Sequence, residues 1–163
     1  MLNQQPDNQV VIYADGACSG NPGAGGFGVV LLHPHKRLEL SKGFRKTTNN
    51  RMELMAVIQG LSSLKKRCHV TIYSDSQYIV NSMTRGWAKK WQANGWKRNS
   101  KERALNSDLW QELLTLCEEH EVEFKWIKGH HGNTENEICD RLATQATSGS
   151  NLEVDSVYEA GGQ

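Results

Sequence analysis

The sequence has 163 residues, of which 37% are hydrophobic and 23% charged, a balance typical of one ordinary globular domain. It contains no run of 18 apolar residues that could span a bilayer, and the polar segment 1–9 lacks the apolar core of a signal peptide, so we expect a cytoplasmic protein without a membrane partner. The net charge is only +1, yet the stretch 85–103 carries +6 and the remainder −5, which predicts a basic arm that a polyanion can sense.

Three strands are predicted in the first 46 residues, and their short connections favour an antiparallel meander. The first strand, 10–15, is β-prone and ends in the carboxylate of Asp15, before a turn rich in Gly, Asn and Pro. The second strand covers 26–32 and the third 37–46. A lone Asp at the end of a buried strand needs a partner or a metal, unless it only opens an Asx-turn over Gly16. Both interpretations stay open at this point.

The hydrophobic period then changes to three and four residues, which predicts a helix from Asn50 to Lys66. Asn50 is its expected N-cap, with Glu53 as the partner in a capping box. The next strand, 70–75, again ends in Asp, and because a helix intervenes it should return parallel through a right-handed crossover. The remaining predicted elements are helical segments at 76–83 and 87–92, a helix at 107–120, a strand at 122–127 and a helix at 134–147, followed by a frayed tail from Ser148.

The order of these elements predicts an α/β fold with a mixed sheet and helices on both faces. We expect a single domain over 1–150, with 1–9 and 151–163 as flexible tails. If the first and fourth strands are parallel neighbours, Asp15 and Asp75 lie at the same sheet edge about 5 Å apart. Open α/β sheets bind their ligands at such an edge.

Two further acids can reach that edge, Glu53 in the first turn of the first long helix and Asp140 on the last helix. Each has a plain alternative, Glu53 as a capping partner and Asp140 as a solvated charge. Carboxylates this close stay charged cheaply only around a cation. Four acids without a soft ligand select a hard divalent ion, Mg²⁺ or Mn²⁺. The four cysteines are widely spaced and are predicted to be free thiols. Two such ions roughly 3.5–4 Å apart would clamp the attacking and leaving oxygens of a phosphodiester displacement.

Four motifs, at 14–23, 47–54, 74–78 and 128–140, follow one another in an order that resembles bacterial type 1 ribonuclease H. The resemblance covers about residues 10–147. It implies a five-stranded mixed sheet of order 3-2-1-4-5 with a basic helical protrusion. It also implies an endoribonuclease that cuts the RNA strand of RNA–DNA hybrids, largely without regard to sequence, and leaves 5′-phosphate and 3′-hydroxyl ends. The acids that it assigns to catalysis and to two Mg²⁺ ions, with Mn²⁺ as the alternative, are Asp15, Glu53, Asp75 and Asp140.

A histidine in the last loop also matches the family. The resemblance implies that His130 aids proton handling or product departure, and a glycine-flanked imidazole suits that role. The alternative is an ordinary solvated histidine. His131 follows directly, so either residue could serve in part.

The resemblance further implies how a hybrid is held. The residues expected to contact the RNA strand are Cys18, Asn21, Asn49, Asn50 and Gln77. The residues expected to bind the DNA strand and its phosphates are Lys46, Thr48, Asn106, Trp87 and the basic arm of Lys89, Lys90, Lys97 and Arg98. Many relatives have Arg where Lys46 stands, and Lys offers a point charge in place of a bidentate fork. Trp91 and Trp96 are expected to belong mostly to the core.

Three other functions compete with this hypothesis. A resolvase, integrase or exonuclease domain would act on DNA, but the run Thr48-Asn49-Asn50 and the basic arm argue against it. A non-catalytic hybrid-binding module would not need all four acids. A small phosphatase would need a different nucleophilic Asp motif. We expect a monomer without an obligate protein partner.

Overall fold

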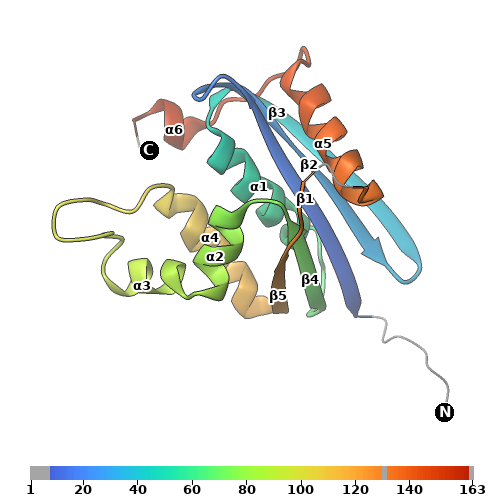
Figure 1. Cartoon of the computed structure of the whole chain (residues 1–163), viewed down its shortest axis with the longest axis horizontal. Helices are drawn as coiled ribbons and strands as arrows, with labels where there is room; N and C mark the ends of the chain where they lie inside the picture. Colours follow the sequence, from blue (N-terminus) through green and yellow to red (C-terminus); the bar gives the residue numbers. More distant parts are fainter. Residues whose placement is uncertain (1–7, 130–131, 162–163) are drawn as a thin grey trace.

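The structure is a computed structural model that describes residues 8–129 and 132–161. Its strands and helices follow the predicted order, with one additional short helix near the C-terminus (Figure 1). They are β1 (Gln9–Ser19), β2 (Gly23–His33), β3 (Lys36–Thr47), α1 (Asn49–Ser62), β4 (His69–Ser74), α2 (Gln77–Thr84), α3 (Trp87–Ala93), α4 (Ser107–Glu119), β5 (Glu121–Trp126), α5 (Thr134–Thr147) and α6 (Ser156–Glu159).

The strands form one five-stranded sheet in the order β3-β2-β1-β4-β5 (Figure 1). The first three strands pair antiparallel, because short turns can reverse the chain between them. β4 lies parallel to β1 and β5 parallel to β4, because α1 and α2–α4 carry the chain back to the starting edge each time. The predicted mixed sheet and its strand order are therefore confirmed.

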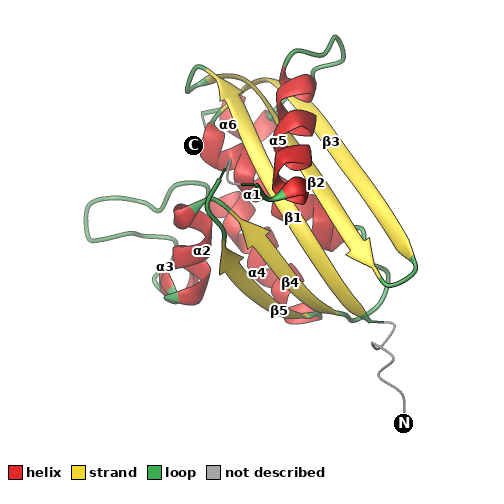
Figure 2. Ribbon diagram, turned by 45° about the vertical axis from the view of Figure 1, so that its right-hand side comes forward, coloured by secondary structure: helices red, strands yellow, loops and turns green. Residues whose placement is uncertain are grey.

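Helices cover both faces of this sheet (Figure 2). α5 lies on one face across β1 and β2, and α1 lies on the other with α4 behind it. The alternation of side chains along β1 turns Ile12 toward α1, where a Cβ added to Gly60 would lie 3.1 Å from it. Trp110 of α4 is fully buried and completes the core on this side. The basic arm projects from this layer as α3 and the loop that leads to α4 (Figure 1).

Two boundaries differ from the predictions in ways that affect the site. The first strand does not end at Asp15, since β1 continues against β2 to Ser19. Asn50 is not the N-cap of α1, because the side chain of Thr48 takes that role and accepts the N–H of Arg51. The capping box between Asn50 and Glu53 is therefore wrong, and Glu53 is available for another use.

The C-terminal segment corrects the expectation of a frayed tail for residues 151–161. Glu153 pairs with β3, its N–H donating to the Gly43 carbonyl at 2.8 Å, and Asp155 is 3% exposed. A short helix, α6, follows with Asp155 as its N-cap. The segment docks because its acids meet buried and surface arginines, which composition alone could not reveal. Residues 1–7 lie outside the described part of the chain.

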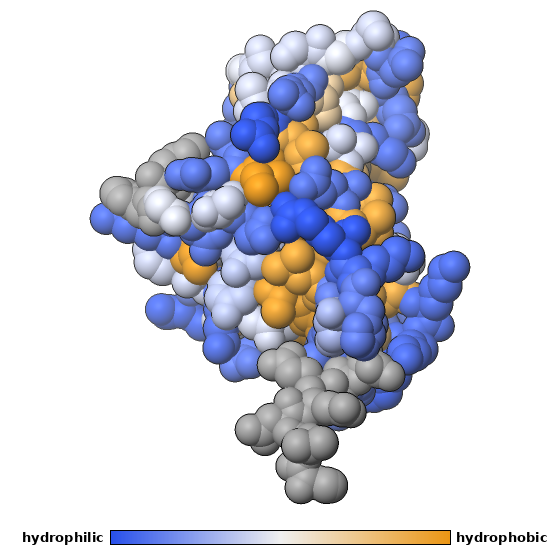
Figure 3. All heavy atoms as spheres, turned by 90° about the vertical axis from the view of Figure 1, so that its right-hand side faces the viewer, coloured by the Kyte–Doolittle hydropathy of each residue, from blue (hydrophilic) through white to orange (hydrophobic). Residues whose placement is uncertain are grey.

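The surface carries no extended apolar area on the side drawn in Figure 3, where apolar side chains are interrupted by hydrophilic ones. Within the described residues, every helix is too short or too polar to cross a bilayer. All four cysteines are free, as predicted.

Candidate active site

The register of β1 and β4 brings two aspartates side by side. The last parallel pair is Ala14 with Ser74, so Asp15 and Asp75 follow directly on neighbouring strands. Asp15 is 4% exposed and accepts the N–H of Gly16 at 3.0 Å. The shared edge predicted for the two aspartates is present, although β1 runs on past it.

Glu53 reaches the same place because α1 packs directly on β1. A Cβ added to Gly16 would lie 2.6 Å from the Glu53 nitrogen, so only glycine permits this approach. Glu53 is buried, and its Oε2 has no hydrogen-bond partner within the described residues. A buried oxygen without a partner costs free energy unless a ligand satisfies it.

Asp140 comes from the opposite face of the sheet. α5 crosses β2 at Gly28, the residue paired with Asp15, where an added Cβ would lie 2.3 Å from the Cys139 carbonyl oxygen. This close crossing places Asp140 beside Asp15, near enough for its charge to raise the pKa of Asp15. The structure thus brings together all four acids that the sequence singled out.

The carboxylates crowd one another strongly. One oxygen each from Asp15, Glu53 and Asp75 can be chosen so that all lie within 4.8 Å. Burial, and then the charges of Asp75 and Asp140, raise the pKa of Asp15 to about 8. Burial, and then the charge of Asp15, raise the pKa of Glu53 well above its usual range. Without a cation the cluster therefore holds protons that an ordinary carboxylate would have released.

The donor set fits a hard divalent cation. It consists of carboxylate oxygens from Asp15, Glu53 and Asp75. Oε2 of Glu53 is buried and has no hydrogen-bond partner among the residues that the structure describes. Oxygen ligands of this kind suit Mg²⁺ and Mn²⁺ and do not suit soft metals. The cluster can therefore bind a metal ion.

The predicted loop histidines, His130 and His131, lie outside the described residues. The residue before them is placed, and a Cβ added to Gly129 would lie 2.7 Å from Oδ2 of Asp75. Gly129 itself therefore lies at the edge of the acidic cluster.

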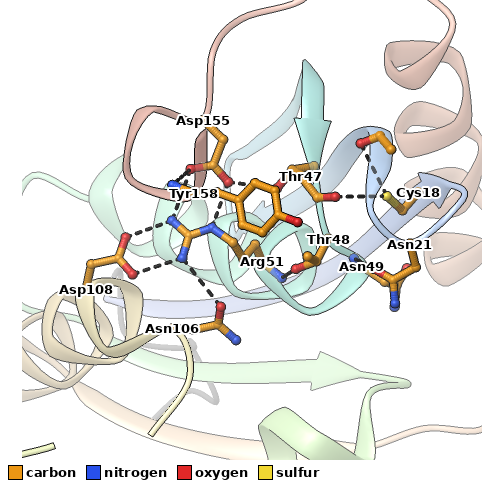
Figure 4. Close-up of polar contacts among 11 residues, drawn as sticks. Cys18, Asn21, Thr47, Thr48, Asn49, Arg51, Asn106, Asp108, Asp155 and Tyr158 are labelled. Carbon is orange, nitrogen blue, oxygen red and sulfur yellow. Dashed lines mark hydrogen bonds and ion pairs between the residues drawn. The ribbon is translucent and has the colours of Figure 1, made fainter. Parts of the chain in front are cut away.

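Several residues expected to contact RNA lie together next to the start of α1 (Figure 4). Asn21 accepts the backbone N–H of Asn49 at 3.1 Å through its Oδ1. The thiol of Cys18 donates to the carbonyls of Gly23 and Thr47, at 3.6 Å and 3.5 Å. The other two expected contacts, Asn50 and Gln77, are exposed on the first turns of α1 and α2.

The residues expected to bind a DNA phosphate differ in their freedom. Lys46 is exposed and Thr48 half-buried at the helix cap. Asn106 is buried, and its side chain already bonds Arg51 and the hydroxyl of Tyr78. Asn106 therefore bonds to neighbouring side chains of the fold, in addition to any contact that it makes with substrate.

The basic arm is exposed as expected. Trp87 stands 37% exposed at the start of α3, with the guanidinium of Arg85 5.8 Å from the centre of its ring. Trp91 packs edge-on against Trp110 at 5.9 Å, and Trp91 and Trp96 are both half-buried against the core. The four charged residues of the arm, all exposed, are Lys89, Lys90, Lys97 and Arg98.

One residue beside the acids escapes sequence reasoning. Trp126, 46% exposed at the end of β5, donates its indole N–H to the backbone carbonyl of Asp75 at 3.2 Å. Its only signal is position, since the last residue of the fifth strand pairs with Ser74, directly before Asp75. Arg51 and Asp155 were missed as well, because nothing in their local sequence marks them as partners.

Comparison with known proteins places this geometry in a family. A family model described as RNase H matches residues 7–148. A protein named Ribonuclease H from Rippkaea orientalis is 61% identical over 158 residues, which cover 97% of this chain and 96% of the relative.

Two solved structures are similar as well. A crystal structure described as a type 1 RNase H with the type 2 active-site motif is 36% identical, covers 98% of this chain and 82% of its own, and has a TM-score of 0.79. An RNase H crystallised with an RNA/DNA hybrid is 24% identical, covers 85% and 96% and has a TM-score of 0.65, which shows a shared fold. From its family match, its relatives and its strand order together, this chain belongs to the ribonuclease H family of hydrolytic nucleases, as a bacterial type 1 member.

Proposed function

We propose that this chain hydrolyses the RNA strand of RNA–DNA hybrids by internal cleavage, largely without regard to sequence, and leaves 5′-phosphate and 3′-hydroxyl ends. The observation that carries the proposal is the acidic cluster, in which Asp15, Glu53 and Asp75 offer oxygens within 4.8 Å of one another with Asp140 beside them. Membership of the family and the hybrid bound to a structural relative support the choice of substrate.

Asp15, Glu53, Asp75 and Asp140 would hold two Mg²⁺ ions, with Mn²⁺ as the alternative. Such ions, when bound, supply an activated water and stabilise the charge that develops on the scissile phosphate. Asp15 lies between the other acids and is the natural shared ligand. Burial of Asp15 and Glu53 excludes bulk water, which strengthens their electrostatic interactions. Asp140, half-buried on α5, forms the solvent side of the cluster.

The remaining residues bind and orient the hybrid. The 2′-hydroxyl groups that distinguish RNA both donate and accept hydrogen bonds, and side-chain amides at turns can read them. We assign this reading to Cys18, Asn21, Asn49, Asn50 and Gln77. We assign the DNA strand to Lys46, Thr48, Asn106, Trp87 and the basic arm, and proton handling or product departure to His130.

The decisive assay offers the full chain four labelled substrates, namely an RNA–DNA hybrid, duplex RNA, duplex DNA and single-stranded RNA, with Mg²⁺, Mn²⁺ or EDTA. We expect metal-dependent cutting of the hybrid's RNA strand alone. Products should accept a 5′-end label only after phosphatase treatment. Cutting of duplex DNA would favour the resolvase, integrase or exonuclease alternative. Tight binding of the hybrid without cutting would favour a non-catalytic module.

A pair of variants on one helix sharpens this assay. Asp140→Asn should reduce cleavage strongly, because it removes an acid that contacts Asp15. Glu137→Gln changes an exposed acid three residues earlier and should leave cleavage unchanged. Equal loss in both variants would contradict a specific role for Asp140. Action as a monomer in the cytoplasm belongs to the same proposal and is tested by size-exclusion chromatography and cell fractionation.

A further inference from the structure

Arg51 lies at the centre of a buried polar network that joins three distant parts of the chain (Figure 4). Its side chain is 1% exposed in the first turn of α1. It contacts Asp155 of the C-terminal segment, whose side chain is 2% exposed, and Asp108 of the first turn of α4. A cation at this depth persists only where its charge and its donors are all matched.

The match is complete. The guanidinium donates to Asp155 from Nε at 2.7 Å and from Nη2 at 3.1 Å, and to Asp108 from Nη1 at 2.9 Å and from Nη2 at 2.7 Å. Its fifth N–H donates to Oδ1 of Asn106 at 3.4 Å. Because a guanidinium has five N–H donors, none is left for a ligand. Arg51 is therefore not itself a contact for substrate.

The network nevertheless reaches the residues assigned to substrate. The backbone N–H of Arg51 donates to the Oγ1 of Thr48, and its side chain holds Asn106. Asp155 also accepts the hydroxyl of Thr47 at 2.7 Å, and the carbonyl of Thr47 accepts the thiol of Cys18. One buried arginine thus links two of the residues proposed to meet a DNA phosphate, Thr48 and Asn106.

Asn106 shows why such a link is needed. It has a φ of 60°, a left-handed conformation that Asn adopts more readily than most residues but that contacts must still hold. It lies before α4, whereas Thr48 lies before α1. Their relative placement depends on the side chains that join the two helices at this end, and Arg51 bonds directly to Asp108 of α4.

We infer that Arg51 is a positioning residue for the DNA strand of the hybrid, and that the C-terminal segment 151–161 holds it in place through Asp155. The inference rests on the proposed function. Arg51 and Asp155 set where Thr48 and Asn106 stand, so that one phosphate can meet both at once. The chemical step should be unaffected, because the carboxyl group of Glu53 lies by Asp15 and the backbone N–H of Gly16 in β1, and is not among the groups that bond to the guanidinium.

The test compares Asp155→Asn with Glu153→Gln in the full chain. Both variants remove one acid from the same segment, but the carboxylate of Glu153 pairs at 3.5 Å with the exposed Lys42, which has no assigned part in binding. We expect Asp155→Asn to raise KM for the hybrid about 10-fold with kcat retained, the pattern expected when a contact that binds substrate and transition state equally is lost. Glu153→Gln should match the unaltered chain in both constants. Assays are run well below the melting temperature of each variant.

A second measurement separates positioning from mere stability. Hybrids that carry one neutral methylphosphonate at successive DNA-strand linkages identify the phosphate whose neutralisation weakens binding to the unaltered chain. That penalty should shrink at least about threefold in Asp155→Asn, because the contact is already displaced. If Asp155→Asn does not fold, Asp108→Asn decides the question, since it loosens the same guanidinium from its half-exposed side.

The outcomes are distinct. An Asp155→Asn variant that melts earlier but keeps the KM and the methylphosphonate penalty of the unaltered chain overturns the inference, because Asp155 then acts on stability alone. A fall in kcat at unchanged KM also overturns it. If the unaltered chain neither binds nor cuts a hybrid, the proposed function itself has failed, and the other outcomes presuppose that it has not.

Discussion

Arg51 and Glu53 stand two residues apart on α1 and are both buried, yet the protein treats their charges in opposite ways. The guanidinium of Arg51 has a partner for every donor, from Asp155, Asp108 and Asn106. Glu53 is surrounded by like charges and keeps one oxygen without a partner in the described chain. A satisfied buried charge holds elements together, whereas an unsatisfied one marks a place for a ligand.

The largest effect is expected from removing one carboxylate of the acidic cluster. Asp15→Asn should lower kcat on the hybrid by about 10³-fold or more, because the central ligand of the cluster is lost. The fold should survive, since Asn has the same shape and removes a repulsive charge. Cleavage in excess Mg²⁺, with circular dichroism as the check of folding, measures both. Near-normal activity would refute the assignment of Asp15.

The second-largest effect is expected from removing the fully hydrogen-bonded guanidinium of Arg51. Arg51→Met should destabilise the protein by about 3–5 kcal/mol, because two aspartates lose their shared cation and one of them is buried. Urea unfolding in EDTA measures the free energy. Arg45→Met, which cuts an exposed pair to the same C-terminal segment, is the control and should change stability little. Comparable losses in both variants would show that the network is no stronger than a surface pair.

The pH dependence of the metal-free protein sharpens the comparison. The folded-state pKa of Asp15, about 8, exceeds its ordinary value of 3.8, so the folded protein holds more protons than the unfolded one between these values. The stability that this proton contributes is therefore fully present below about pH 4 and is lost as the pH rises toward 8, by up to about 1.4 kcal/mol per pH unit for each such proton.

Unfolding in EDTA from pH 5 to 8 measures this slope. Glu53→Gln should make the slope shallower and raise stability at pH 8, because one of the crowded charges is gone. Saturating Mg²⁺ should flatten the slope in the unaltered chain, since a bound cation favours the charged carboxylates. A slope of opposite sign in EDTA would contradict the crowding of charge in the cluster.

The smallest effect concerns charges that water screens. Lys89 and Lys90, exposed on α3, should each contribute roughly 0.7–0.9 to the slope of log affinity against log salt concentration if they meet phosphates. Replacing both by Gln should reduce the slope accordingly. Lys65 and Lys66, an equally exposed adjacent pair, are the matched control and should leave it unchanged. Equal changes in the two pairs would mean that the arm acts only through net charge.

Local patterns predicted most elements well, and their failures have a physical cause. The helix at 134–147 was predicted with the bounds that it has, because its apolar residues recur at helical spacing. The prediction of a capping box at Asn50 was wrong because two residues close in sequence, Thr48 and Asn50, are both suitable N-caps. Which of them caps α1 depends on the path of the backbone from β3 into the helix. The C-terminal segment failed because its order comes from Arg51 and Arg45, about a hundred residues earlier in the chain.

The sequence by itself determined the class of fold, the order of the strands through its resemblance to a family, and the identity of the four acids, because residue spacing and motifs carry that information. Only the tertiary structure decided that Gly16 and Gly28 let two helices come close enough to bring Glu53 and Asp140 to Asp15. The tertiary structure alone decided that every donor of the Arg51 guanidinium has an acceptor, whereas one oxygen of Glu53 has no partner among the described residues. Burial and hydrogen-bond partners depend on the three-dimensional arrangement of distant residues, so a segment acquires them only when the chain folds.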